Sequence, residues 1–139
     1  MNDRPFKIIR PHAAIKKHPI LVSIPHSGTL IPEKIAKGMH RDITRLPEDT
    51  DWLVDEIYNF CPSLGITTIS ANFSRYVVDL NRPTNSTNLY VDGRKETNVI
   101  PVSTFSGAEI YKHPLTKEHE LEERLPKYYH PYYNTILID

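Results

Sequence analysis

The stretch PILVSIPHSG, residues 19–28, gives the clearest indication of secondary structure in this sequence. Residues 19–24 are an apolar run rich in β-branched side chains, which is typical of a buried strand. Pro25, His26, Ser27 and Gly28 then end the run in a turn. The turn places the imidazole of His26 at the carboxyl end of a strand, where open α/β sheets bind their ligands.

Two helices are predicted after this strand. Residues 32–38 form a short helix that begins at Pro32, a residue tolerated in the first turn. Residues 47–60 form a second helix, capped by Asp49 or Thr50, with acidic residues in its first turn. One face of this helix carries apolar residues at helical spacing, and we expect it to pack on a sheet: Leu53, Ile57 and Phe60.

The rest of the chain continues the alternation of strands and helices. Residues 66–71 are β-branched and predict a strand near the first one, and residues 76–80 predict a short extended piece. Residues 83–114 are too long for a structureless loop and predict an active-site loop with small strands. A last helix runs from about residue 116, kinked or divided by Pro126 and Pro131. This order predicts one α/β domain over residues 1–139, with residues 1–17 as a peripheral tail.

Composition narrows the function classes. The 17 basic and 17 acidic residues give a net charge of +0, so no electrostatic argument favours nucleic acid or an anionic membrane as a partner. No apolar run approaches the ~20 residues that cross a bilayer, and the first residues do not form a signal peptide. The single cysteine excludes an internal disulfide. A cytoplasmic protein is the simplest account.

Histidine and aspartate side chains are the first candidates for chemistry. His26 follows a proline, which helps to fix it as metal ligation requires, although a loop histidine can instead bond to backbone. Asp49 and Asp51 stand at a helix start, where acids usually cap free N–H groups, yet Asp51 lies beyond the expected cap. Because zinc sites recruit a histidine and a carboxylate from different loops, we expect His26 and Asp51 to approach each other.

The stretch SRYVVDLNRP, residues 74–83, carries two arginines beside a short apolar run. The guanidinium of arginine is a planar fork suited to carboxylates, and Asn81 can add an amide donor. The pattern therefore predicts a site for a small carboxylate built by Arg75, Asn81 and Arg82. The alternative is a structural contact between Arg82 and Asp79, with Arg75 in solvent.

Five blocks, taken together, resemble the N-formylglutamate amidohydrolase family. They occur in order as PHSG at 25–28, DTDW at 49–52, SRYVVDLNRP at 74–83, IPVSTFSGAEIY at 100–111 and YYHPYYNTI at 128–136. The resemblance implies a three-layer αβα fold with a mixed central sheet, similar to zinc carboxypeptidases and aspartoacylases. It also implies a metal-dependent hydrolase that releases formate and L-glutamate from N-formyl-L-glutamate, as in histidine degradation.

The resemblance also assigns roles to individual residues. His26 and Asp51, with Asp49 as the weaker choice, would bind Zn²⁺ or another divalent metal, and Arg75 would face the scissile carbonyl. The substrate side would be formed by four residues: Asn81, Arg82, Ser106 and Gly107.

The expected metal site is incomplete within this sequence. Family members continue into a strand and an Asp-x-His-Ser motif that supplies another histidine ligand, so we expect this chain to be the N-terminal part, with a sheet incomplete at the C-terminus. Two alternatives stay open: a zinc-dependent deacylase or peptidase of another N-acyl amino acid, and a non-catalytic remnant that binds small carboxylates. No motif predicts the oligomeric state.

Overall fold

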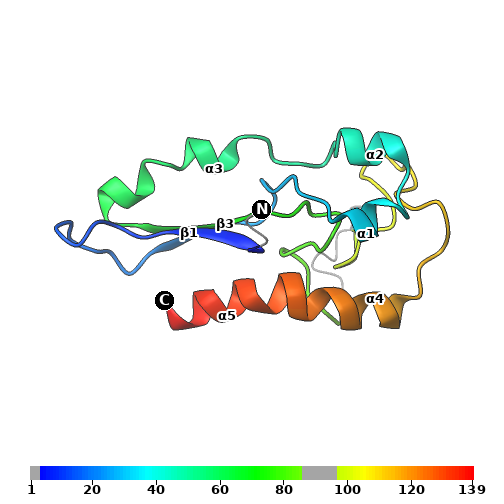
Figure 1. Cartoon of the computed structure of the whole chain (residues 1–139). Coiled ribbons are helices and arrows are strands. Elements are labelled where there is room, and N and C mark those ends of the chain that lie inside the picture. The colour runs from blue at the N-terminus through cyan, green and yellow to red at the C-terminus, as the bar shows by residue number, and fades with distance from the viewer. Residues whose placement is uncertain (1–3, 86–96) are drawn as a thin grey trace, which may run out of the picture.

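A computed structural model describes residues 4–85 and 97–139 of the chain (Figure 1). Its centre is a small mixed sheet in the order β1-β3-β2. The strands are β1 (Phe6–Ile9), β2 (Leu21–Ile24) and β3 (Thr67–Ala71). β2 runs parallel to β3, whereas β1 runs antiparallel to it. The chain is therefore an α/β protein with a mixed sheet, as the sequence predicted.

The two predicted strands are confirmed as neighbours. Ser23 of β2 lies opposite Ile69 of β3 in the parallel pair. β1 lies within residues 1–17, the segment for which the sequence predicts a peripheral tail. That interpretation is wrong for residues 6–9, where the short run Phe-Lys-Ile-Ile pairs with β3 as an edge strand.

The helices lie around this sheet in a clear order. Figure 1 shows α3 along one side of the sheet, the C-terminal helical run along the other, and α1 and α2 beyond the end of the strands. The helical elements are α1 (Glu33–Ala36), α2 (Arg41–Arg45), α3 (Val54–Ile57), the 3₁₀ turn η1 (Cys61–Leu64), α4 (Lys117–Arg124), the π-helical turn η2 (Leu125–Tyr129) and α5 (His130–Ile138).

The helix predicted over residues 47–60 is mostly wrong. Only α3 is α-helical there, and Leu53 before it has a left-handed φ of 61°, which a continuous helix cannot contain. No side chain caps α3, so the predicted caps are also wrong. Leu53, Ile57 and Phe60 are 60%, 63% and 50% exposed rather than packed on the sheet.

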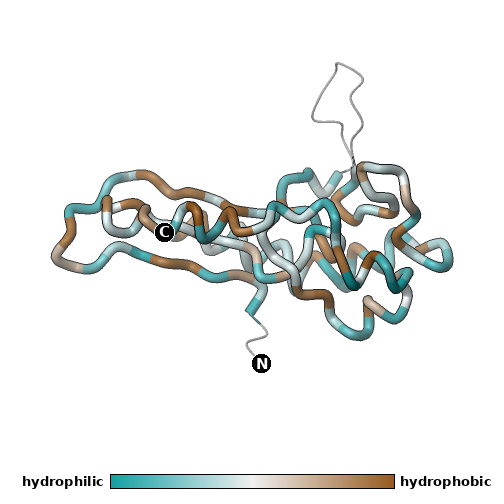
Figure 2. The backbone as a smooth tube through the Cα atoms, turned by 90° about the horizontal axis from the view of Figure 1, so that it is seen from above, coloured by the Kyte–Doolittle hydropathy of each residue, from teal (hydrophilic) through white to brown (hydrophobic). Residues whose placement is uncertain are grey.

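The main core lies between the sheet and the C-terminal helices, and a second buried cluster contains Met39, Ile43 and Tyr76. Ile69 and Ala71 of β3 pack with Tyr132 of α5, and both Ile69 and Tyr132 are fully buried. Pro126 falls inside the π turn, so the predicted interruption of the last helix is confirmed there. Figure 2 shows apolar segments along the elongated part of the molecule that holds the sheet.

The segment between β3 and α4 is irregular where the structure describes it. Residues 76, 77 and 80 lie in turns and residues 78–79 are irregular, so the predicted extended piece does not form a strand. Part of the predicted active-site loop, residues 86–96, lies outside the described residues. The described remainder contains isolated antiparallel bridges, Ser103 with Glu109 and Tyr111 with Met39, but no strand, so the predicted small strands are not found in the described part of this segment. Within residues 4–85 and 97–139, no helix combines the length and apolar character that crossing a bilayer requires.

Candidate metal and carboxylate site

The turn after β2 is tied to two neighbouring segments. The amide of Asp51 donates to the carbonyl of His26 at 2.9 Å, which joins the 49–52 loop to the turn. On the other side, Gly28 lies so close to the chain that an added Cβ would be 2.2 Å from the carbonyl oxygen of Phe73. A glycine is therefore required at this position, and the position of His26 is fixed from both sides.

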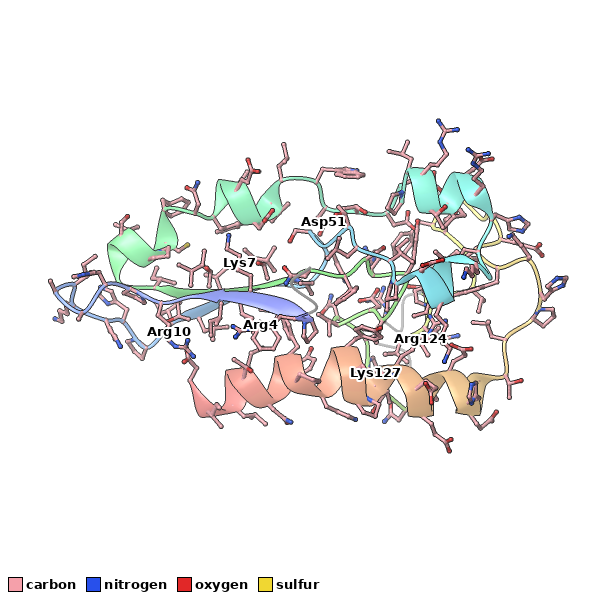
Figure 3. All side chains as sticks on the ribbon, viewed as in Figure 1. Arg4, Lys7, Arg10, Asp51, Arg124 and Lys127 are labelled. Atoms are coloured by element: carbon pink, nitrogen blue, oxygen red, sulfur yellow. The ribbon has the colours of Figure 1, made fainter. Side chains whose placement is uncertain are left out.

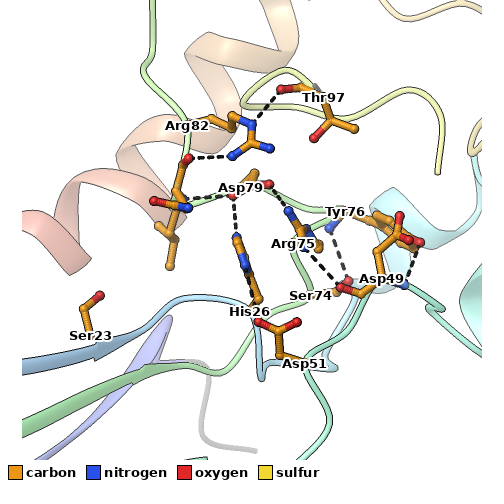
Figure 4. Close-up of polar contacts among 12 residues, drawn as sticks. Ser23, His26, Asp49, Asp51, Ser74, Arg75, Tyr76, Asp79, Arg82 and Thr97 are labelled. Atoms are coloured by element: carbon orange, nitrogen blue, oxygen red, sulfur yellow. Dashed lines mark hydrogen bonds and ion pairs between the residues drawn. The ribbon is translucent and has the colours of Figure 1, made fainter. Parts of the chain in front are cut away.

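The His26 imidazole lies between two carboxylates (Figure 4). Its Nε2 is 2.7 Å from Oδ1 of Asp79, and its Nδ1 is 3.6 Å from Oδ2 of Asp51. Asp79 is fully buried, while the Asp51 side chain is 52% exposed. One ring nitrogen thus faces the protein interior and the other faces an exposed acid, so the approach of His26 and Asp51 predicted from sequence is confirmed.

Asp79 lies at the centre of the site, although the sequence did not predict it as a functional residue. Its Oδ1 also accepts the amide of Asn81 at 2.9 Å, and its Oδ2 accepts Nη2 of Arg75 at 2.8 Å. Burial acts to raise the pKa of the Asp79 carboxyl, but the hydrogen bond and charge of His26, followed by the charge of Arg75, outweigh it and lower the pKa. Asp79 is therefore ionised at neutral pH and holds a proton of His26 on Nε2.

Arg75 is buried and bound to protein groups rather than solvated. Besides the ion pair with Asp79, its Nη1 donates to the carbonyl of Asp49 at 3.3 Å. Its guanidinium carbon lies 4.9 Å from the ring centroid of Phe105, a cation–π contact. The structural alternative from sequence, with Asp79 on Arg82 and Arg75 in solvent, is therefore wrong. The spacing of four residues between Arg75 and Asp79 was the signal that could have identified the pair.

Arg82 and Asn81 lie on the loop that follows Asp79. Arg82 is buried, and it donates from Nε to the carbonyl of Thr97 and from Nη1 to that of Asn81, both at 2.9 Å. The hydroxyl of Tyr129 donates to the carbonyl of Arg82 at 2.9 Å. These bonds fix the plane of the guanidinium beside Asp79 and the exposed Asn81.

Asp49 occupies a different place from Asp51. Its Oδ2 accepts the amide of Phe105 at 3.0 Å, and Figure 4 shows its side chain beyond Arg75, away from His26. Beside it, the hydroxyl of Ser106 donates to Glu48 at 2.6 Å, and Gly107 has a left-handed φ of 97°. Asp49 thus fastens the 105–107 loop, and Asp51 is the acid that reaches His26.

The donor set fits a divalent metal in part. In the neutral imidazole, a proton on Nε2 leaves the Nδ1 lone pair facing the Asp51 carboxylate, so two acceptors converge. Because metal–donor bonds are about 2 Å long, two ligand atoms of one zinc ion lie up to ~4 Å apart, which the 3.6 Å separation satisfies. Among the residues that the structure describes, no group of three or more histidine, cysteine or acidic side chains could hold a metal.

A protein-family model and two curated proteins match this chain over most of its length. The family model for N-formylglutamate amidohydrolase matches residues 18–137. The N-formylglutamate deformylases of Pseudomonas putida and Pseudomonas aeruginosa are 34% and 36% identical over 119 residues, which make up 85% of this chain and 43% and 44% of theirs. The chain therefore spans less than half the length of these curated relatives.

Solved structures show the same likeness. The crystal structure of N-formylglutamate amidohydrolase from Ralstonia eutropha JMP134 has a TM-score of 0.75 and 27% identity, covering 94% of this chain and 48% of that one. A gene product from Agrobacterium tumefaciens has a TM-score of 0.71 and covers 96% of this chain and 48% of its own, but at 22% identity it supports the fold alone. Since the family model covers most of the sequence, the chain belongs to the N-formylglutamate amidohydrolase family.

Proposed function

We propose that this chain provides part of the active site of a metal-dependent hydrolase that cleaves N-formyl-L-glutamate into formate and L-glutamate. The names of the two curated Pseudomonas relatives support this substrate. The observation that carries the metal dependence is the position of His26, with Nε2 on buried Asp79 and Nδ1 toward exposed Asp51. We also infer the three-layer αβα fold of the family, of which this chain would form one portion.

His26 and Asp51 would hold the metal, with Zn²⁺ as the expected ion. Metal-bound histidines usually donate their second ring N–H to a carboxylate, which sets the tautomer and the ring orientation. Asp79 is placed for that role at 2.7 Å from Nε2. When bound, the ion would polarise the formyl carbonyl and activate water for attack on it. Two protein ligands are fewer than the three or four that zinc sites normally use, so we expect weak binding by this chain.

The substrate would lie beside the loop from residue 75 to residue 82. Arg82 and Asn81 would bind the glutamate carboxylates, because the fixed guanidinium plane of Arg82 suits a bidentate contact. Arg75 would provide a fixed positive charge near the carbonyl oxygen, where negative charge develops during attack. Ser106 and Gly107 would border the substrate, with their loop fastened by Asp49.

Zinc binding tests the proposal without requiring a complete catalytic set. We expect calorimetric titration with Zn²⁺ to give one weak site, and Asp51→Asn to weaken it at least tenfold because a carboxylate ligand is lost. Asp42→Asn is the matched control, since Asp42 is an exposed acid in the first turn of α2. Equal Zn²⁺ affinity in wild type and both variants would refute the metal site.

Substrate assays separate the proposed activity from its alternatives. Formate release from N-formyl-L-glutamate that is abolished by a chelator and restored by Zn²⁺ would support the proposal. Faster release of the acyl group from N-acetyl or other N-acyl amino acids would instead favour a different deacylase. Binding of L-glutamate without turnover of any of these compounds would favour a carboxylate-binding module.

A further inference from the structure

Arg124 of α4 is a buried cation that the proposed chemistry does not use. It is only 3% exposed, although the first turn of its helix, residues 117–119, is exposed. Nε and Nη2 bind Oε2 of Glu120 at 2.8 and 2.7 Å, one turn earlier in the same helix. Figure 3 shows Arg124 between α4 and the loops of the site half of the molecule. A surface ion pair with Glu120 alone would not require this burial.

The remaining guanidinium nitrogen of Arg124, Nη1, binds the backbone of the turn over residues 75–77. Nη1 lies 3.1 Å from the carbonyl oxygen of Val77 and 3.4 Å from that of Tyr76. The same nitrogen donates to the hydroxyl of Tyr111 at 2.7 Å, and this hydroxyl donates in turn to the Tyr76 carbonyl at 3.3 Å. Arg124 therefore binds both peptide carbonyls, and Tyr111 shares that of Tyr76.

In the sequence, Tyr76 and Val77 lie between Arg75 and Asp79, the two residues that form an ion pair in the site. Arg75 precedes them, and Asp79 follows two positions after Val77. The Arg75–Asp79 ion pair closes across the turn at 2.8 Å, and Asp79 then fixes Nε2 of His26 at 2.7 Å. A change in the turn must move Asp79, because protein interiors transmit small displacements rather than absorb them.

The energetic cost of this burial indicates a positional role. Taking a guanidinium out of water is expensive, and among the described residues one partly exposed glutamate, Glu120, provides its counter-charge. The cost is offset because Arg124 satisfies the Val77 carbonyl, which no other donor among the described residues reaches, and shares the Tyr76 carbonyl with Tyr111. The arrangement therefore favours one geometry of the turn over the alternatives that a looser contact would allow.

We infer that Arg124 is a positioning residue: by binding the Tyr76 and Val77 carbonyls, it sets the placement of Asp79 and through it the orientation of His26. The relevance of this inference to metal binding rests on the proposed function. The effect on the orientation of His26 does not depend on the proposed function, because this orientation can be measured in the absence of any metal.

The test follows the His26 Nε2–H proton by NMR in the metal-free protein, assigned by its loss in His26→Gln. Arg124→Met keeps the length of the side chain but removes its donors, and it should shift and broaden this signal. Arg124→Lys, which keeps a charged donor, should bring the His26 signal part of the way back to its wild-type position and width. Zn²⁺ affinity should fall about tenfold in Arg124→Met, as for other changes behind a metal ligand.

Leu121→Ala is the matched control for lost stability. Leu121 lies one turn earlier on α4 and packs against the main core, so its truncation should lower the Tm without changing the His26 signal. If Arg124→Met behaves like Leu121→Ala, Arg124 is merely structural and the inference fails.

A milder variant keeps the inference testable if Arg124→Met does not fold. Tyr111→Phe removes the hydroxyl shared by Arg124 and the Tyr76 carbonyl, and it should shift the His26 signal in the same direction by a smaller amount. An unchanged signal in Tyr111→Phe would overturn the inference. If wild type binds no Zn²⁺ while the NMR shifts occur, the positioning role stands and the metal proposal fails.

Discussion

Replacement of Asp79 by asparagine isolates the charge at the centre of the site. The two side chains have the same shape, so packing is retained. The amide oxygen can still accept from Nε2 of His26 and from the amide of Asn81. The new NH₂ group, however, replaces Oδ2 and faces Nη2 of Arg75, donor against donor, across 2.8 Å. The substitution therefore leaves Arg75 as a buried cation without this counter-charge.

The magnitude follows from how deeply the pair is buried. The Asp79 side chain is 0% exposed and the Arg75 side chain 8%, so solvent provides little compensation. Removing one partner of a buried ion pair costs about 3–5 kcal/mol. With a urea m-value of about 2 kcal/mol/M for a domain of this size, the unfolding midpoint should fall by about 2 M.

Urea unfolding followed by far-UV circular dichroism measures this effect. Asp42→Asn makes the same chemical change at an exposed site of α2 and should alter stability by no more than about 0.5 kcal/mol. Arg75→Met should cost less in the Asp79→Asn background than in wild type, because the cation that it removes is already unpaired. Equal midpoints for the two Asp→Asn variants, or an additive double-mutant cycle, would contradict the argument.

Three further substitutions test other parts of the structure. Gly28→Ala should lower the Tm by an amount equivalent to about 1–3 kcal/mol, because its Cβ would meet the Phe73 carbonyl oxygen at 2.2 Å; an unchanged Tm would refute this close approach. Burial raises the pKa of Tyr132 from 10.0 to about 12, so its stabilisation is complete below pH 10 and disappears as the pH rises to about 12. This loss should be about 2–3 kcal/mol in pH-dependent unfolding and should be reduced in Tyr132→Phe. Arg82→Lys should raise KM for N-formyl-L-glutamate, or weaken L-glutamate binding, by about tenfold, because lysine lacks the planar fork; an unchanged value would make Arg82 structural.

The sheet could be predicted from sequence where local signals and burial agree. Residues 20–24 and 66–71 are apolar and β-branched over most of their length, and the structure pairs them. The signal failed at residues 47–60, where apolar spacing is helical but Leu53 takes a left-handed conformation. Periodicity reports which side chains could share a face, whereas the backbone dihedral of one residue decides whether the helix continues. β1 was missed because four residues carry too little pattern to identify an edge strand.

The candidate site was predictable in its residues but not in its pairing. The approach of His26 and Asp51 followed from the turn after a strand and from the chemistry of metal ligands. Asp79 could pair with Arg75 or with Arg82 on sequence spacing alone. The choice depends on turns over residues 75–77, which are fixed by distant partners such as Arg124. Contacts of this kind arise from the tertiary fold and leave no local signal.

β2 has a consequence for how the protein behaves at high concentration. In the described sheet β2 is an edge strand, because its order is β1-β3-β2. Ile20, which precedes β2, is more than half exposed, and so are Leu53 and Ile57 in the segment along one side of the sheet. An unpaired strand edge next to apolar surface is a template for pairing with another chain. Purified alone, the chain should therefore scatter light increasingly with concentration, and charged substitutions at Leu53 and Ile57 should keep it dispersed.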